Sequence, residues 1–164
     1  LYYVKQNGKN NYSWYNQIHY GNTSNTSLDL KQIANSLQTS GSYSGALHLE
    51  YRDFTRQYEY IHQLMTRNQW NCYLVVVTME TVQDTLPYIE EIEEALEHMG
   101  EAIQDNIRKV DVCTRYSAMQ YLIILSHPAE TQIPNIMSRI FMEYYKLQDS
   151  QNFTPSYEYI SMKK

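Results

Sequence analysis

Few residues of this chain have both the type and the spacing that catalysis requires. The chain contains five histidines: His19, His48, His62, His98 and His127. They are scattered, and none has a second His or Cys at the spacing of a metal site. The 5 glycines form no phosphate-binding loop, and nucleophile-elbow and triad patterns are absent. The residues alone therefore predict no catalytic centre, no metal site and no cofactor.

The cysteines and the acidic residues favour structural roles. Cys72 and Cys113 fall inside predicted strands, where a buried, inert thiol is expected. A run of glutamates follows the outer face of a predicted helix: Glu90, Glu91, Glu93, Glu94, Glu97 and Glu101. Such a run could hold a metal or a partner, but a solvated helix face is the favoured interpretation. The formal net charge of -5 disfavours binding to duplex nucleic acid, because neutralising phosphates requires a basic field.

The length and composition predict one folded domain with an appendage. The chain has 164 residues, of which 43% are hydrophobic and 19% are charged, a mixture that supports a globular core. No apolar run reaches the ~18 residues that a membrane helix needs, and no signal-peptide pattern opens the chain. We therefore expect a cytoplasmic domain that makes no membrane contact within this segment.

Hydrophobic periodicity predicts the elements that must position any site. Apolar residues spaced three and four apart predict helices over 51–65, 86–107 and 133–147. Apolar runs and alternation predict strands over 72–79, 110–114, 119–126 and 153–162. The short connection 115–118 implies an antiparallel hairpin. Helices that cross between non-adjacent strands then predict a mixed sheet flanked by helices.

The predicted hairpin resembles the core of the GGDEF family of diguanylate cyclases. Residues 108–121 read RKVDVCTRYSAMQY and are followed by LIIL. In that family Arg-x-x-Asp and an Arg-Tyr pair precede Gly-Gly-Asp/Glu-Glu-Phe at the hairpin tip, and an apolar strand follows. The register matches, but the signature positions hold Ser117, Ala118, Met119, Gln120 and Tyr121. The resemblance covers about residues 45–162 and implies an α/β (α+β) fold of the nucleotidyl-cyclase or palm type.

The resemblance also implies that the cyclase reaction is lost. Joining two GTP molecules into cyclic di-GMP requires carboxylates that hold divalent cations and a backbone that GTP can approach closely. Met119 and Gln120 replace the hairpin acids, and Ser117 and Ala118 replace the paired glycines. The first-strand acidic pattern reads Thr78-Met79-Glu80. We therefore expect a bacterial, non-catalytic regulatory module of a cyclic-di-GMP signalling protein, a degenerate GGDEF domain.

Arg108 and Asp111 stand where the family carries its RxxD product-inhibition motif. By that resemblance, Arg108 would bind phosphate and guanine, and Asp111 would accept hydrogen bonds from the guanine edge. A planar guanidinium suits both partners because it pairs bidentately. The chain would then be a receptor for cyclic di-GMP. The alternative is that both residues only cap a helix end and start a strand. The domain would then be a dimerisation scaffold that binds no nucleotide and pairs with another GGDEF domain in cis or with a second copy.

The first residues resemble the tail that closes GGDEF domains. Residues 1–12 read LYYVKQNGKNNY, and the family tail reads Ala-Leu-Tyr-x-Ala-Lys-x-x-Gly-Lys-Asn-x-Tyr. We therefore expect residues 1–15 to be the C-terminal tail of a preceding GGDEF-like domain. Residues 16–45 would form a linker with a short helix, and 46–164 a degenerate GGDEF domain that lacks its closing helix. One hypothesis is that the N-terminal segment covers the vacant sheet face, within the chain or by exchange between two chains.

Overall fold

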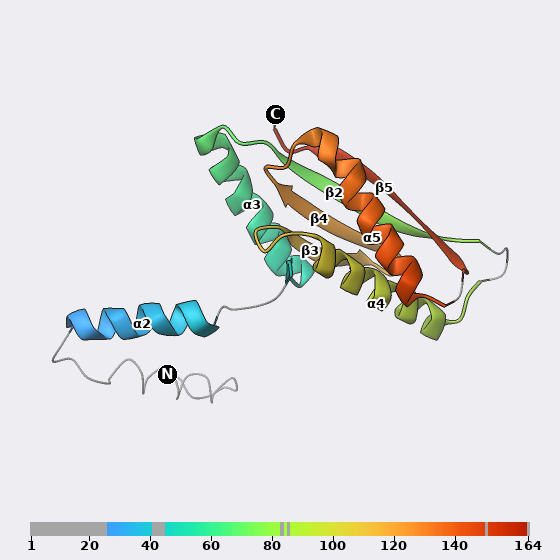
Figure 1. The fold of residues 1–164 in the computed structure, drawn as a ribbon, viewed down its shortest axis with the longest axis horizontal. Coiled ribbons are helices and arrows are strands. Elements are labelled where there is room, and N and C mark those ends of the chain that lie inside the picture. Colours follow the sequence, from blue (N-terminus) through green and yellow to red (C-terminus); the bar gives the residue numbers. More distant parts are fainter. Residues whose placement is uncertain (1–25, 41–44, 83, 85, 150, 164) are drawn as a thin grey trace. The chain divides into compact units, whose positions relative to one another are not determined.

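The chain divides into two units, Leu1–Ser42 and Tyr43–Lys164. The computed structural model describes residues 26–40, 45–82, 84, 86–149 and 151–163. In the first unit, helix α2 (Thr26–Ser40) falls inside the stretch that the sequence predicts to be a linker with a short helix (Figure 1). Residues 1–25 lie outside the described residues, and the predicted closing tail (residues 1–15) falls among them.

The second unit is built on a five-stranded mixed sheet with the strand order β1-β3-β4-β2-β5. The strands are β1 (Leu47–His48), β2 (Cys72–Thr81), β3 (Val112–Ser117), β4 (Gln120–Ser126) and β5 (Phe153–Ser161). Strand β1 runs parallel to β3, and the other neighbours are antiparallel. The predicted mixed sheet is therefore confirmed. Strand β1 is not predicted, because two residues are too few to show a period of two.

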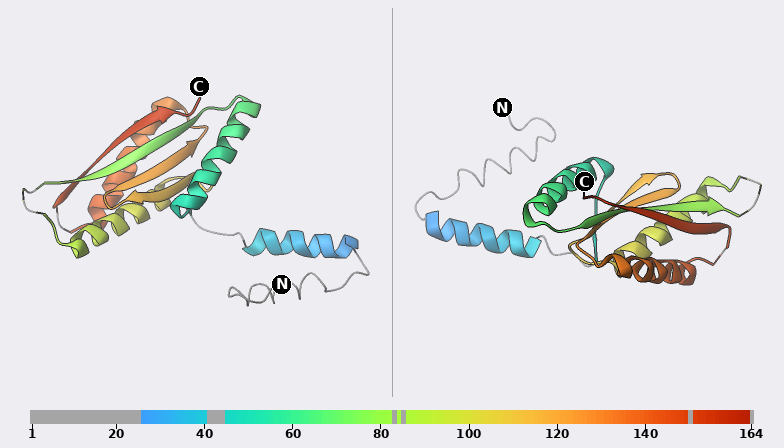
Figure 2. Two further views of the ribbon diagram at one scale, coloured as in Figure 1. Left: turned by 180° about the vertical axis from the view of Figure 1, so that it is seen from behind. Right: turned by 90° about the horizontal axis from the view of Figure 1, so that it is seen from above.

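Helices cover both faces of this sheet. They are α3 (Tyr51–Asn68), α4 (Ile89–Asn106), the single 3-10 turn η1 (Glu130–Gln132) and α5 (Ile133–Leu147). Helices α4 and α5 pack side by side on one face, and α3 lies on the opposite face (Figures 1 and 2). Pro134 stands in the first turn of α5, where its missing N–H has no helical partner in any case. The sequence predicts this helix from residue 86, but α4 begins at Ile89. Leu86 lies before the helix and is 95% exposed.

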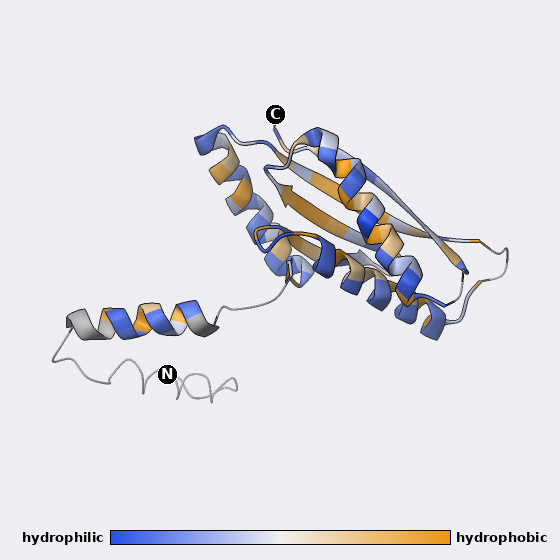
Figure 3. Cartoon of the chain, viewed as in Figure 1, coloured by the Kyte–Doolittle hydropathy of each residue, from blue (hydrophilic) through white to orange (hydrophobic). Residues whose placement is uncertain are grey.

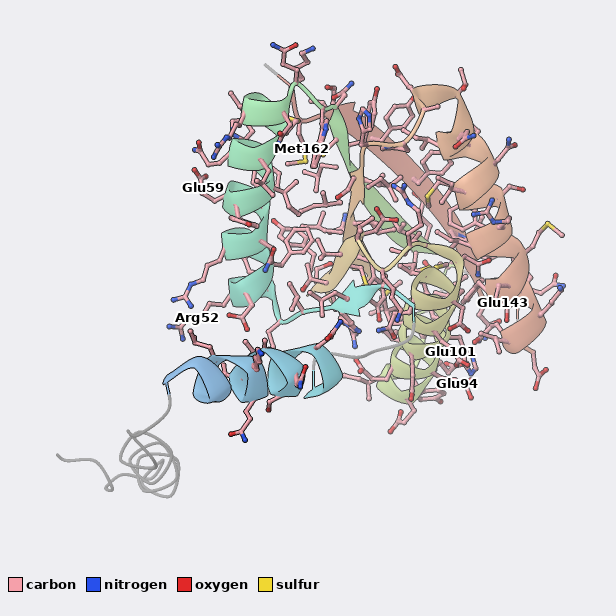
Figure 4. All side chains as sticks on the ribbon, turned by 60° about the vertical axis from the view of Figure 1, so that its left-hand side comes forward. Arg52, Glu59, Glu94, Glu101, Glu143 and Met162 are labelled. Atoms are coloured by element: carbon pink, nitrogen blue, oxygen red, sulfur yellow. The ribbon has the colours of Figure 1, made fainter. Side chains whose placement is uncertain are left out.

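The alternation of β2 divides the core into two clusters. Tyr73, Val75, Val77 and Met79 face the larger cluster, which α4 and α5 complete with residues such as Leu96, Met99, Met137 and Ile140. Cys72 and Leu74 face the smaller cluster beneath α3, where they meet Phe54, Met65, Ile124 and Met162 (Figure 4). The continuous apolar run of β2 therefore reflects helix cover on both faces, and the apolar colour of β2 and β4 in Figure 3 shows the same pattern.

The predicted acidic run lies on the outer face of α4. Glu94 and Glu101 project away from the sheet, as does Glu143 of α5 (Figure 4). Glu91 is half-buried instead, and its carboxylate accepts a hydrogen bond of 2.8 Å from the Tyr88 N–H at the start of the helix. Most of the run is therefore solvated, as a solvent-facing helix surface requires. Among the described helices, none is long and apolar enough to cross a membrane.

The hairpin turn lies later than the sequence predicts. Strand β3 continues to Ser117, so the connection is Ala118–Met119 rather than 115–118. Arg115 is opposite Tyr121 while Ser117 is opposite Gln120, which leaves Tyr116 as an extra residue in a bulge. The bulge resets the register, so β3 extends past the point where its apolar pattern ends.

Candidate functional site

Strand β4 connects the two regions that the sequence singles out. Its first residues, Gln120 and Tyr121, are the last two of the five residues that stand at the family's signature positions, 117–121. At its end, the Ser126 carbonyl oxygen accepts a hydrogen bond from Arg108 Nη2, and the Ser126 N–H donates to Asp111 Oδ1 at 2.9 Å. The structure therefore brings Arg108 and Asp111 together and places the altered hairpin tip at the opposite end of the strand.

Neutral side chains bond to one another at the hairpin tip. Gln120 lies opposite Thr78 of β2, and its Nε2 donates to Thr78 Oγ1 at 3.2 Å. Ser117 Oγ donates to Gln120 Oε1 at 3.1 Å, and the Met119 carbonyl oxygen accepts from the Met79 N–H at 2.8 Å. The positions of the expected metal ligands therefore form a local network that holds the turn against β2.

These residues do not fit a site for divalent cations. Hard cations prefer carboxylate oxygens, and Thr78, Met119 and Gln120 supply none. Glu80 is exposed and lies two residues beyond the last pair of β2 with β4, opposite Thr154 of β5. Among the described residues, no three or more His, Cys, Asp or Glu side chains are grouped where they could hold a metal ion. His19 lies outside these residues.

Tyr121 is a core residue beneath α4. Its side chain is buried, and its hydroxyl donates a hydrogen bond of 2.8 Å to the Leu96 carbonyl oxygen. Burial raises the pKa of the Tyr121 phenol to about 12. Gly100 of α4 makes room for the ring, because a Cβ at that position would lie 2.5 Å from the Tyr121 hydroxyl oxygen. The last signature position therefore anchors the hairpin to the helix.

Arg115 fixes the hairpin to α4 from the outside. Its guanidinium makes two hydrogen bonds of 2.8 Å to the Glu93 carboxylate and donates to the Ala118 carbonyl oxygen at 3.1 Å. The hydrogen bonds and charge of Arg115 lower the pKa of the Glu93 carboxyl. The same guanidinium thus contacts both the turn and the helix, and it stabilises the conformation of the tip.

Asp111 is used within the protein, whereas Arg108 is used there only in part: its Nε and Nη2 each lie 3.4 Å from an Asp111 carboxylate oxygen, and Nη2 also donates to the Ser126 carbonyl oxygen. Asp111 is 1% exposed, and its carboxylate accepts from the Arg108 N–H at 2.8 Å as well as from Ser126. The Arg108 side chain is 56% exposed and lies 3.4 Å from Asp111 through Nη2. The Arg108 side chain therefore remains partly accessible, while Asp111 orders the turn between α4 and β3.

A cavity of about 320 Å³ adjoins Arg108. Asp111 also lines it, together with His127 and Pro128 after β4 and with Asn135 and Arg139 of α5. The Arg139 guanidinium donates to the Asn106 carbonyl oxygen at 3.2 Å, which keeps the side chain beside the end of α4. The sequence does not point to Arg139, because only the packing of α5 beside α4 brings it near Arg108. From the sequence, His127 is weighed only as a possible metal ligand, not as a residue of this cavity.

Comparisons with known proteins identify the fold. No protein-family model and no curated protein sequence matches the chain. A diguanylate cyclase from Thermotoga maritima has a similar structure, with a TM-score of 0.57, 21% identity and coverage of 71% of this chain and 82% of that one. Diguanylate cyclase SiaD from Pseudomonas aeruginosa, solved with its activator SiaC, gives a TM-score of 0.62 at 10% identity, and the match covers 94% of this chain but only 63% of SiaD.

A third similar structure is the GGDEF domain of DgcB from Caulobacter crescentus, solved in complex with cyclic di-GMP. Its TM-score is 0.55 at 11% identity, with coverage of 68% of this chain and 69% of that one. At these identities the likeness concerns the fold. The mixed sheet, its strand order and its flanking helices in this chain therefore have the fold of the GGDEF domains of diguanylate cyclases.

Proposed function

We propose that this chain is a non-catalytic regulatory domain that binds cyclic di-GMP in the cavity beside Arg108. The observation that carries the proposal is the exposed Arg108 guanidinium at the rim of a cavity that Arg139 and His127 also line. Two arginines and one carboxylate, Asp111, line this cavity, so in a chain with a formal net charge of -5 it keeps an excess of one positive charge. An anionic ligand is therefore the class that the site suits.

The chemistry of the rim favours a guanine nucleotide among anions. An arginine fork pairs bidentately with a phosphate or with the O6 and N7 acceptors of guanine. The amide of Asn135 and the imidazole of His127 add further hydrogen-bonding groups along the same wall. The cavity of about 320 Å³ lies at the small end of ligand-sized sites, which run from roughly 300 to 1,000 Å³. It therefore suits part of a cyclic dinucleotide rather than the whole molecule.

Asp111 supports this site indirectly. Its hydrogen bond from the Arg108 N–H closes the turn that presents the Arg108 side chain, and its hydrogen bond from the Ser126 N–H ties that turn to the end of β4. Asp111 is thus a positioning residue, and Arg108 is the ligand contact.

The hairpin tip supports the absence of cyclase activity. In-line attack on an α-phosphate needs cations held by carboxylates, and the local network of Ser117, Thr78 and Gln120 is neutral. The side chains of Ser117 and Ala118 also occupy positions where paired glycines would leave the backbone open. The domain would therefore respond to cyclic di-GMP rather than make it.

Calorimetry with cyclic di-GMP tests the receptor function. We expect saturable binding by the full chain and at least a roughly tenfold loss of affinity in Arg108→Ala, since charge-assisted hydrogen bonds are lost. Arg52→Ala, which removes an exposed arginine on α3, is the matched control and should bind like the wild type (Figure 4). No binding by the wild type overturns the proposal and favours the dimerisation scaffold. Conversion of GTP with Mg²⁺ or Mn²⁺ overturns the non-catalytic assignment.

A further inference from the structure

A second cavity is related to the Arg108 cavity by a ring contact between Trp70 on its wall and His127 on the wall of the first. It has a volume of about 470 Å³ and lies where α3 ends, β2 begins and β5 ends. Six residues line it: His62, Met65, Thr66, Gln69, Trp70 and Lys163. It combines an aromatic ring, a thioether and an ammonium group. These groups suit a flat, partly apolar ligand that carries negative charge.

Trp70 and His127 form an aromatic pair between the two cavities. Trp70 lines the second cavity and His127 lines the first, and their ring centroids are 6.0 Å apart with 31° between the planes. Trp70 is 40% exposed, so part of its indole surface is open. The pair therefore connects the cavities through a surface on which a planar base can stack.

The backbone holds both rings in place. The Trp70 N–H donates to the Met65 carbonyl oxygen at 3.0 Å, and the Asn71 N–H donates to His127 Nδ1 at 3.3 Å. Gln69 and His127 have φ values of 59° and 54°, and in the part of the chain that the structure describes they are the two non-glycine residues with positive φ. Gln69 is the left-handed residue that ends α3, a common helix end, and it sets the direction in which Trp70 leaves the helix. The positive φ of His127 follows the end of β4 and turns its ring toward Trp70.

A chain of contacts leads from Arg108 to Trp70. Arg108 Nη2 contacts the Ser126 carbonyl oxygen, Ser126 precedes His127, and the His127 ring packs beside Trp70. Basic side chains lie at both ends, with Arg108 and Arg139 in the first cavity and Lys163 in the second. A cyclic dinucleotide has two purines and two phosphates, so a ligand with one nucleotide at Arg108 carries a second purine, for which this aromatic pair offers a stacking surface.

On this basis, and resting on the proposed function, we propose that the second cavity is a subsite for the second purine of cyclic di-GMP. Trp70 stacks on the base, with His127 behind it, and Lys163 lies near its phosphate. Trp70 is thus a specificity-determining residue that favours dinucleotides over a single guanine nucleotide, which can occupy only the Arg108 cavity.

Calorimetry on the full chain tests the subsite. We expect Trp70→Ala to bind cyclic di-GMP roughly five- to one-hundredfold more weakly, the range for loss of one base–aromatic stack. GMP affinity should change little, and Trp70→Phe should retain part of the dinucleotide affinity. Tyr60→Ala, which removes another exposed aromatic ring from α3, is the control and should match the wild type. Thermal melts of each variant verify folding, and Trp70→Phe keeps the test valid if Trp70→Ala does not fold.

Tryptophan fluorescence gives an independent readout. The chain has two tryptophans, so Trp14→Phe leaves Trp70 as the sole reporter. Cyclic di-GMP should quench or shift its emission in a saturable way. Suppose that the wild type binds cyclic di-GMP, that Trp70→Ala binds it equally well, and that the emission of Trp14→Phe does not change on binding. These results together overturn the subsite alone. Absence of binding by the wild type overturns the proposed function itself, so the two failures are distinguishable.

Discussion

Asp111 is a buried carboxylate on which the turn between α4 and β3 depends. Its oxygens accept from the N–H groups of Arg108 and Ser126, and the side chain is 1% exposed. We expect Asp111→Ala to lower the free energy of unfolding by roughly 3 kcal/mol, because two part-buried N–H groups lose their charge-assisted hydrogen bonds and Arg108 loses its ion-pair partner. Urea denaturation measures the change. Asp105→Ala, at an exposed position of α4, should stay within about 0.5 kcal/mol.

A loss below about 1 kcal/mol in Asp111→Ala would contradict this structural role, since losing one hydrogen bond to a charged group alone has at least that effect. A small stability change combined with lost cyclic di-GMP binding would instead restore Asp111 as a direct ligand contact.

Gly100 and Tyr121 form a size-matched pair across the helix–sheet interface. A Cβ on Gly100 would lie 2.5 Å from the Tyr121 hydroxyl oxygen and 3.1 Å from its Cζ. We expect Gly100→Ala to destabilise the wild type although alanine has the higher helix propensity by about 1 kcal/mol. In a Tyr121→Phe background the hydroxyl clash is absent, so the same substitution should be less harmful. A double-mutant cycle by urea denaturation measures this coupling, and additive effects of the two substitutions would contradict the predicted contact.

At the scale of the elements, Arg115 links the hairpin to α4 through Glu93. The folded-state pKa of Glu93 is lowered below its ordinary value of 4.5, chiefly by the Arg115 hydrogen bonds. The ion pair therefore stabilises the fold fully above that value, and the contribution is lost as the pH falls through the folded pKa. We expect Arg115→Gln to lower Tm more at about pH 7 than at about pH 3, modestly because the pair is partly exposed.

Thermal melts across this pH range measure the difference. Arg52→Gln, on the exposed face of α3, should show no such trend. An Arg115→Gln deficit that is equal at both pH values would mean that the bonds from Arg115 to the turn carbonyls, rather than the ion pair, stabilise the tip.

The elements themselves could largely be predicted from the sequence. The three- and four-residue spacing of residues such as Ile133, Ile136 and Ile140 fixes α5, and the run Cys72–Thr81 fixes β2. Local patterns did not reveal the bulge at Tyr116, because a bulge depends on the partner strand. They also could not reveal the cavity, since Arg108 and Arg139 become neighbours only when α4 and α5 pack together.

At the scale of the whole second unit, the sheet separates two cores of unequal size. Helices α4 and α5 bury the larger cluster, and α3 alone covers the smaller one. Each cluster contains one cysteine: Cys113 lies in the larger and Cys72 in the smaller. Burial raises the pKa of Cys113 to about 12 and is also the main cause of the raised pKa of Cys72. Both thiols should therefore resist alkylation in the native state.

These cysteines can report whether the two faces open together. Fewer buried apolar residues lie in the cluster beneath α3 than in the cluster beneath α4 and α5, so we expect α3 to detach before the sheet unfolds. With Cys72 as the only cysteine (Cys113→Ala), maleimide labelling should begin at a urea concentration below the midpoint that circular dichroism gives. With Cys113 as the only cysteine (Cys72→Ala), labelling should follow that midpoint. Coincident labelling of both thiols would mean that α3 and the α4–α5 face unfold as one cooperative unit.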